Sequence, residues 1–238
     1  MTSTSTLRHT PLHELHRQLG AKMVPYAGWE MPVQYPTGIL AEHNAVRTGV
    51  GVFDVSHMGE FEITGPDRNA FVNRITCNDV TQVAPGGVQY SGILTPEGTF
   101  VDDCTLYRFD NKWMVVVNAA NTAAAWKHLV DHKGGANIRL KDISDEVGLL
   151  ALQGPRAEAL LQPLTRVPLA DIAYYHFDAG SVAGVDCFIS RTGYTGEDGF
   201  ELYCRDRSVG VLWTALTGAG AAPIGLGARD SLRLEMGY

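Results

Sequence analysis

The chain has 238 residues, of which 45% are hydrophobic and 19% are charged, and its formal net charge is −7 at pH 7. This is ordinary globular composition, with enough apolar side chains for one large domain or two modest ones. The acidic balance, without any run of Lys or Arg, argues against nucleic acid as a partner. No stretch approaches the roughly 18 consecutive apolar residues of a membrane helix.

The first ten residues are rich in Ser and Thr and contain no apolar stretch of the kind found in signal peptides. We therefore expect a short disordered leader over residues 1–10 and a cytoplasmic location. Thr10 is expected to cap a helix over residues 11–19, with Gly20 just beyond it. A second helix is expected over Ile39–Thr48, ending at Gly49.

Residues 24–35 carry four large side chains among prolines: Tyr26, Trp29, Met31 and Tyr35. Such a segment can line a pocket for a flat ring or seal the edge of a core, and composition leaves both open. The run 53–60 then places polar residues among apolar ones. Its His57 is either a proton shuttle near its ordinary pKa of about 6.5 or, as we favour, a hydrogen-bonded structural side chain.

Two later stretches resemble each other. Residues 61–66 and residues 150–155 each read as a strand followed by a Gly-Pro corner, and helices over residues 67–75 and 156–164 follow. The first unit continues into strands 89–94, 99–108 and 112–118, with a turn at residues 95–98. The second continues into strands 181–191 and 199–204. We interpret this as a weak internal duplication, although two common corners can also coincide.

Polar side chains suit the N-termini of two further helices. Asn121 is expected to cap residues 122–132, and Ser208 a segment that carries Val211, Leu212 and Leu216. Hairpin-joined strands among irregularly placed helices favour an α+β fold with antiparallel sheets and flanking helices over a doubly wound parallel sheet.

The pair Asp102 and Asp103 lies inside an otherwise apolar strand, where a carboxylate is costly unless it has partners or a task. Successive side chains of a strand point to opposite faces, so only one of the two is expected to enter a given site. Alternation does not decide which, because apolar residues share the parity of each.

A second dense run, residues 191–201, holds three glycines together with Tyr194 and Glu201. The glycines allow a tight turn or a close approach to a ligand. Tyr194 can stack on a ring and Glu201 can accept hydrogen bonds from an amino-heterocycle. The last helix opens at residues 225–229, where Arg229 can bind a carboxylate with two hydrogen bonds.

Several common motifs are missing from the sequence. There is no phosphate-binding GxxxxGK[ST] and no GxGxxG after a strand. The four cysteines form no CxxC pair, which argues against a zinc ribbon. The run from His13 to His16 only approaches a metal motif, so no metal site is expected.

Short matches in a fixed order resemble the glycine-cleavage aminomethyltransferase (T-protein) family over nearly the whole chain. They lie at residues 20–23, 27–32, 53–60, 102–103, 117–121, 153–155, 174–175, 190–201 and 225–230. The resemblance implies glycine catabolism and one-carbon metabolism. The reaction would transfer a methylene group from the aminomethylated lipoyl arm of an H-protein to tetrahydrofolate, with release of ammonia. The lipoylated H-protein and folate are the implied partners, and tetrahydrofolate is the co-substrate.

The resemblance also implies the site. Asp103 would lie beside the reactive folate nitrogens, orient the substrate and assist proton movement at N5. The residues that would hold the pterin, the aminobenzoyl ring and the glutamate are Tyr90, Asn118, Tyr174, Tyr194, Glu201 and Arg229.

The family fold has three domains around the folate. We expect a discontinuous first folate-binding domain over residues 1–55 and 140–238, and an inserted α+β domain over residues 56–139. Family members continue past Tyr238 into a C-terminal β-barrel domain, which we expect to be absent here.

Two alternatives stay open. A related folate-dependent demethylase would share the pocket but not the lipoyl partner. A non-catalytic folate-binding regulatory protein of the same fold carries a Lys-Gly-Cys signature, which this sequence lacks.

Overall fold

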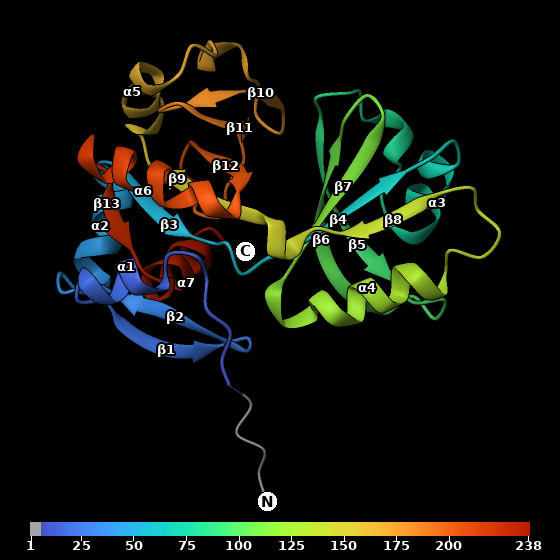
Figure 1. Cartoon of the computed structure of the whole chain (residues 1–238), viewed down its shortest axis with the longest axis horizontal. Helices are drawn as coiled ribbons and strands as arrows, with labels where there is room; N and C mark the ends of the chain where they lie inside the picture. Colours follow the sequence, from blue (N-terminus) through green and yellow to red (C-terminus); the bar gives the residue numbers. More distant parts are fainter. Residues whose placement is uncertain (1–5) are drawn as a thin grey trace, which may run out of the picture. The chain divides into compact units, whose positions relative to one another are not determined.

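The computed structural model describes residues 6–238, which form two compact units (Figure 1). Unit 1 comprises the chain up to His57 together with Gly148–Tyr174 and Asp178–Tyr238. Unit 2 comprises Met58–Val147, drawn from cyan to yellow in Figure 1, and the short segment Tyr175–Phe177. Among residues 6–238, no helix is long and apolar enough to cross a bilayer.

A six-stranded sheet runs through unit 1 in the order β10–β11–β12–β9–β3–β13. Its strands are β10 (Phe177–Val182), β11 (Val185–Ser190), β12 (Gly199–Arg205), β9 (Val147–Gln153), β3 (Gly51–Asp54) and β13 (Ala222–Ile224). Antiparallel pairs join β11 to β12 and β3 to β9, whereas β13 runs parallel to β3. A separate hairpin joins β1 (Lys22–Tyr26) to β2 (Trp29–Gln34). The helices are α1 (His13–Gln18), α2 (Ile39–Thr48), α5 (Ala157–Leu161), α6 (Val209–Gly218) and α7 (Leu226–Glu235).

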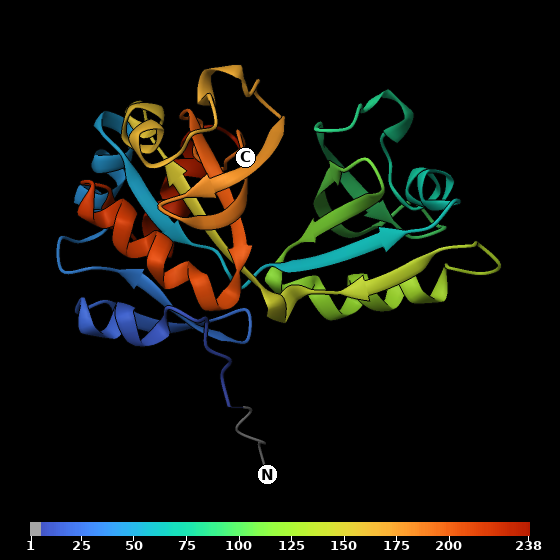
Figure 2. The same cartoon turned by 45° about the horizontal axis from the view of Figure 1, so that its top comes forward.

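Unit 2 contains a five-stranded sheet in the order β5–β6–β7–β4–β8. Its strands are β5 (Val88–Leu94), β6 (Phe100–Arg108), β7 (Lys112–Val117), β4 (Gly59–Thr64) and β8 (Arg139–Asp142). All of the neighbouring pairs are antiparallel. Two helices, α3 (Arg68–Ile75) and α4 (Thr122–Asp131), accompany the sheet (Figure 2). The predicted α+β class with antiparallel sheets is confirmed, with β3–β13 as a parallel exception.

The two sheets repeat one topology. The order β4–α3–β5–β6–β7–α4 in unit 2 returns as β9–α5–β10–β11–β12–α6 in unit 1, and the sheet orders β5–β6–β7–β4 and β10–β11–β12–β9 correspond. An isolated antiparallel β-bridge also recurs in each repeat: Thr76 pairs with Ile93 in unit 2, and Thr165 pairs with Val182 in unit 1. The predicted internal duplication is thus confirmed by topology.

The Gly-Pro corners belong to this repeat. Gly65 and Gly154 both have positive φ, at 110° and 133°. A Cβ at Gly65 would lie 2.5 Å from a backbone oxygen of Asn137, and one at Gly154 would lie 2.4 Å from a backbone oxygen of Gly49. Each corner therefore needs glycine for both its conformation and its close backbone approach. Each proline lies just before the N-cap residue of its helix, not at the first helical position.

Each sheet buries one face in a core of its own. In unit 1, Leu152 and Leu202 of the sheet pack with Leu212 of α6. In unit 2, Phe61 and Leu106 of the sheet occupy a second core, which also contains residues of α3 and α4. All of these side chains are at most 1% exposed, and full burial of such a side chain contributes about 1.5–3 kcal/mol. The two cores share no residue.

Arg8 and Thr10 are ordered, contrary to the disordered leader expected over residues 1–10. Residues 1–5 lie outside the described residues, but Arg8 forms a β-bridge with Trp29 and Thr10 is only 4% exposed. Thr10 does not cap α1, whose N-cap is Leu12. Its hydroxyl instead donates a 2.6 Å hydrogen bond to Asp54, because that buried carboxylate is the stronger acceptor.

Three further expectations about local structure were wrong. Residues 181–191 are not one strand, because Ala183 (φ 51°) and Gly184 (φ 81°) form a tight turn between β10 and β11. Two positive φ values suit the twist of a hairpin, but an alanine in the first position gives no turn signal. Asn121 makes no side-chain cap and donates to Asp102 instead. Ser208 makes none because the 3₁₀ turn Asp206–Ser208 runs directly into α6.

Candidate functional site

Asp102 and Asp103 separate to opposite faces of β6. Asp102 is 4% exposed and shares its face with Cys104 and Leu106, which belong to the core of unit 2. Its carboxylate accepts hydrogen bonds from the backbone N–H of Asn118 (2.7 Å) and from the side-chain amides of Asn118 (3.0 Å) and Asn121 (2.7 Å). Three donors compensate for burial of the charge, so Asp102 is a structural anchor between β6 and the start of α4.

Asp103 lies on the other face, half-buried, and three predicted site residues meet there. The Tyr90 hydroxyl donates to Asp103 Oδ2 at 3.0 Å, and the Asn118 amide donates to Asp103 Oδ1 at 2.7 Å. Because one donor holds each oxygen, the carboxylate is fixed in orientation. An ionised carboxylate can accept about four hydrogen bonds, so these two leave capacity for a ligand.

Strand register explains why these residues meet. Asp103 pairs with Gly92 in β5, two residues from Tyr90, and Cys104 pairs with Val117, the residue before Asn118. A Cβ at Gly92 would lie 2.3 Å from the Phe100 ring. By this register, the side chains of Tyr90 and Asp103 are diagonal neighbours across one strand pair. A side chain as long as that of tyrosine spans this diagonal.

In unit 1, Tyr194 and Arg229 are brought together. The Arg229 guanidinium lies 4.6 Å from the centroid of the Tyr194 ring, and Tyr238 stacks on the same ring at 5.5 Å. Tyr194 thus contacts a cation and a second aromatic ring, which are groups of the kind that bind a flat ligand carrying an anion. Tyr174 is 65% exposed, and burial of its inner part, followed by the influence of Tyr238, raises the pKa of its phenol.

Glu201 lies on β12, where it accepts a hydrogen bond from the Thr192 hydroxyl. Thr192 begins the loop that carries Tyr194, so Glu201 and Tyr194 are linked through this short segment. The side chain of Gln153 supports the same loop by donating to the Thr192 carbonyl (3.0 Å) and accepting from the Thr195 hydroxyl (2.9 Å).

His57 fits neither expectation. It is 3% exposed, and its Nδ1 has no hydrogen-bond partner among the described residues. Burial lowers its pKa to about 4, with Asp54 opposing this shift and Arg229 adding to it. The imidazole is therefore neutral at pH 7 and does not titrate near its ordinary pKa. Its ring meets that of Tyr26 edge-on at 5.7 Å.

The four large side chains of residues 24–35 divide between the two expected roles, which were to line a ligand pocket or to seal the edge of a core. Trp29, Met31 and Tyr35 are at most 9% exposed and belong to the interior, whereas Tyr26 is 42% exposed above His57. Only Tyr26 is thus placed to contact a ligand.

A buried polar network escaped the sequence analysis. Asp54 accepts hydrogen bonds from Thr10 (2.6 Å) and from His16 Nε2 (2.9 Å), and His16 Nδ1 lies 2.8 Å from the Tyr35 hydroxyl. Burial alone would raise the pKa of Asp54, but hydrogen bonds from His16 and Thr10 hold it below its ordinary value. The network joins α1, the residue that follows β2, and the end of β3, and no local pattern could have paired residues so distant in sequence.

The two histidines of the near-metal motif have different partners. His13 Nε2 lies 2.6 Å from Glu30, whereas His16 faces Asp54. His9 stacks on His13, and the ligand atoms of His9, His13 and Glu30 lie within 4.8 Å of one another. The hydrogen bond and ion pairs to Glu30 account for this grouping.

Glu60, on β4, was also missed as a candidate. It is 1% exposed, and neither of its side-chain oxygens has a partner among the described residues. Burial raises the pKa of Glu60 well above its ordinary value, and the carboxylates of Asp142 and Asp145 raise it further.

A surface cavity of about 670 Å³ lies elsewhere in unit 1. Residues of the 163–168 loop and of the β10–β11 hairpin line it, and none of the predicted folate contacts does. It is therefore not the candidate site.

Comparison with known proteins gives consistent results. A family model described as the GCVT N-terminal domain matches residues 12–238. Among curated relatives, the aminomethyltransferases of Chloroherpeton thalassium and Rubrobacter xylanophilus are 51% and 49% identical, each over 98% of this chain. The chain spans 65% and 62% of their respective lengths.

Among solved structures, the glycine cleavage system aminomethyltransferase T of Bartonella henselae superposes with a TM-score of 0.91 at 36% identity. The match covers 98% of this chain and 63% of that one. A chain of the heterotetrameric sarcosine oxidase of Corynebacterium sp. U-96 shares the fold, with a TM-score of 0.58 at 17% identity.

Proposed function

This chain belongs to the GCVT aminomethyltransferase family, and from that premise we propose that it serves the glycine cleavage reaction. In this proposal it transfers a methylene group from an aminomethylated lipoyl arm of an H-protein to tetrahydrofolate and releases ammonia. The lipoylated H-protein and folate are its partners, and the cytoplasm is its compartment. The chain spans 65% and 62% of the lengths of two curated relatives, so the activity of the whole relatives is proposed for it and not assigned to it.

The observation that carries the proposal is the fixed carboxylate of Asp103. Its neighbour Asp102 is buried and accepts three hydrogen bonds, whereas Asp103 accepts two and keeps acceptor capacity beside Tyr90 and Asn118. We assign Asp103 the catalytic role of orienting the reacting folate nitrogen and accepting its proton as the new carbon–nitrogen bond forms. The reaction chiefly needs a donor carbon and a folate nitrogen held in attack geometry, and positioning alone can greatly accelerate such a step.

Tyr90 and Asn118 belong to unit 2 with Asp103, and both orient its carboxylate. The proposed contacts of unit 1 are Tyr174, Tyr194, Glu201 and Arg229. The Tyr194–Arg229 pair suits a ring and a carboxylate, and Glu201 suits an amino-heterocycle.

The test is ammonia release from aminomethyl-loaded H-protein with and without tetrahydrofolate. We expect folate-dependent release by the wild-type protein, and the Asp103→Asn variant should fold normally but lose most of this activity. Asn121→Ala is a useful comparison, because it removes one hydrogen bond to Asp102 and leaves Asp103 untouched. Normal turnover by Asp103→Asn would refute the role of Asp103.

The same assay separates the alternatives. Transfer of a methyl group from a sulfur- or nitrogen-methylated donor to tetrahydrofolate, without any response to the H-protein, would identify a folate-dependent demethylase. Folate binding without turnover of either donor would identify a binding protein of the same fold.

A further inference from the structure

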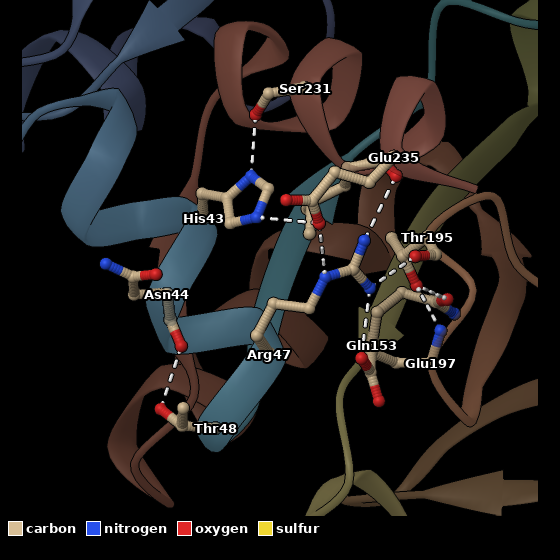
Figure 3. Close-up of polar contacts among 10 residues, drawn as sticks. His43, Asn44, Arg47, Thr48, Gln153, Thr195, Glu197, Ser231 and Glu235 are labelled. Atoms are coloured by element: carbon tan, nitrogen blue, oxygen red, sulfur yellow. Dashed lines mark hydrogen bonds and ion pairs between the residues drawn. The ribbon is translucent and has the colours of Figure 1, made fainter. Parts of the chain in front are cut away.

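Arg47, in the last turn of α2, joins three elements of unit 1 (Figure 3). Its Nη1 donates to the Thr195 carbonyl (2.6 Å) and to Glu197 (3.0 Å), both in the loop between β11 and β12. Its Nη2 donates to the Leu232 carbonyl (3.1 Å) and its Nε to Glu235 (3.0 Å), both in α7. The side chain is only 18% exposed, so solvent screens these bonds less than at an open surface.

His43, one turn earlier in α2, supports this arrangement. Its Nδ1 lies 2.7 Å from the Ser231 hydroxyl and its Nε2 lies 3.1 Å from Glu235, so Glu235 is shared between His43 and Arg47 (Figure 3). α2 therefore holds α7 at two points.

The two elements that Arg47 joins each carry one proposed folate contact. Tyr194 directly precedes Thr195 in the loop, and Arg229 lies three residues before Leu232 in α7. These two residues meet at 4.6 Å. Their separation depends on how the loop sits against α7, which the Arg47 hydrogen bonds help to define.

The loop needs such an anchor because its backbone is glycine-rich. Gly196 has φ +80°, and a Cβ at Gly193 would lie only 1.9 Å from the Gln153 side chain. Gln153 of β9 holds the Thr195 hydroxyl from one side, while Arg47 holds the Thr195 carbonyl from the other. Thr195 is thus fixed between a strand and a helix, one residue from Tyr194.

We propose that Arg47 is a positioning residue for folate binding, which sets the Tyr194–Arg229 pair by fastening the 192–198 loop to α7. This role rests on the proposed function, because the ligand that the pair receives is the folate assigned there. Arg47 acts through the loop and helix, so it governs affinity for folate and not the chemical step.

The chemistry of the anchor requires arginine. Four acceptors on two elements surround one guanidinium, whose donors point in fixed directions in one plane. The ammonium of a lysine is a single point and cannot reach both Glu235 and the two carbonyls at once. Arg47→Lys should therefore keep the charge but recover only part of the function.

The test compares Arg47→Ala and Arg47→Lys with two controls in unit 1. Arg17→Ala removes the same side chain from an exposed site on α1, and Leu216→Ala lowers stability through the core without touching the loop. Affinity for 5-formyltetrahydrofolate is measured by calorimetry, well below the melting temperature of each variant. Hydrogen exchange is followed at the amides of residues 192–198 and 226–235.

For Arg47→Ala we expect folate affinity to fall roughly 3- to 30-fold, the range for a residue that acts through others, with faster exchange in both segments. The folate affinity and exchange rates of Arg47→Lys should lie between those of the wild type and Arg47→Ala. Both controls should bind folate as the wild type does. Wild-type affinity and exchange in a folded Arg47→Ala variant would overturn the proposal. Equal loss in Leu216→Ala would also overturn it, because the effect would then follow from stability alone.

Two further outcomes are decisive. If Arg47→Ala does not fold, Arg47→Lys and Glu197→Gln, which removes one acceptor, are judged by the same criteria. If the wild-type chain itself does not bind the folate, the proposed function fails, whereas the exchange data still decide whether Arg47 fastens the loop to α7.

Discussion

Glu60 shows how one side chain can couple this fold to pH. An acid with a raised pKa in the folded state stays protonated while the unfolded chain ionises. Its contribution to stability is therefore fully present below the ordinary glutamate pKa of about 4.3 and is lost as pH rises toward the folded-state value. The burial of Glu60 and its nearby carboxylates place it in this class.

We predict that Glu60→Gln removes this loss of folding stability at rising pH. Between about pH 4.5 and the raised pKa of Glu60, the unfolding free energy of the wild type should fall relative to the variant by up to about 1.4 kcal/mol per pH unit. Denaturant unfolding at a series of pH values measures the difference. Glu62→Gln, on the same strand but half-buried and paired with Lys112, is the control. A difference that does not vary with pH would show that Glu60 is ionised.

The guanidinium of Arg229 lies against a single aromatic ring, that of Tyr194. Arg229→Ala should weaken binding of a glutamate-bearing folate by roughly 1.5–3 kcal/mol, the scale of a charge-assisted hydrogen bond. Calorimetry with folate and with a pterin lacking the glutamate separates the contributions. The pterin should lose much less affinity, and equal losses would place Arg229 at the ring instead.

The 192–198 loop shows what an element needs besides sequence propensity. The backbone at Gly193 lies in close contact with the Gln153 side chain. Both Gln153 and Arg47 form hydrogen bonds with Thr195. The loop is therefore shaped by contacts from β9 and α2, not by its own turn residues.

We predict that Gly193→Ala displaces this loop. The added Cβ would lie 1.9 Å from Gln153 Oε1, and such overpacking typically costs about 1–3 kcal/mol. Folate affinity should fall as well, because Tyr194 is the next residue. Gly218→Ala, at the end of α6 with no atom within 4 Å of the new Cβ, is the control. Thermal unfolding and calorimetry give both quantities, and unchanged values for Gly193→Ala would disprove the close approach.

At the scale of the whole molecule, each of the two related sheets has a separate core. Leu202 is fully buried in unit 1 and Leu106 is fully buried in unit 2, and no core residue is shared. Such cores can unfold as separate cooperative regions.

We predict that Leu106→Ala and Leu202→Ala each destabilise mainly their own unit, by about 2–5 kcal/mol. Hydrogen exchange with peptide-level resolution should show lost protection in Met58–Val147 for the first variant and in Gly148–Tyr174 and Asp178–Tyr238 for the second. Equal loss across both units would show that they unfold as one.

The sequence alone was sufficient where the information is local. The helix Ile39–Thr48 was predicted with its observed bounds, and both Gly-Pro corners and the duplication were visible. Periodicity, glycine and proline act over a few residues, so they reveal elements and the α+β class. The ordered family motifs added the identity of the candidate residues, from Tyr90 to Arg229.

The tertiary structure decided what depends on distant partners. Alternation could not choose between Asp102 and Asp103, because the choice rests on strand register and on the side chain of Asn118. The hidden turn at Ala183 and the hydrogen bond of Thr10 to Asp54 were missed because tertiary packing outweighed local preference. The hydrogen-bond partners of Arg47 are separated from it by 148 to 188 positions in the sequence. Nothing near Arg47 in the sequence indicates these partners, because the free energy that fixes its side chain comes from carbonyls and carboxylates that only folding brings together.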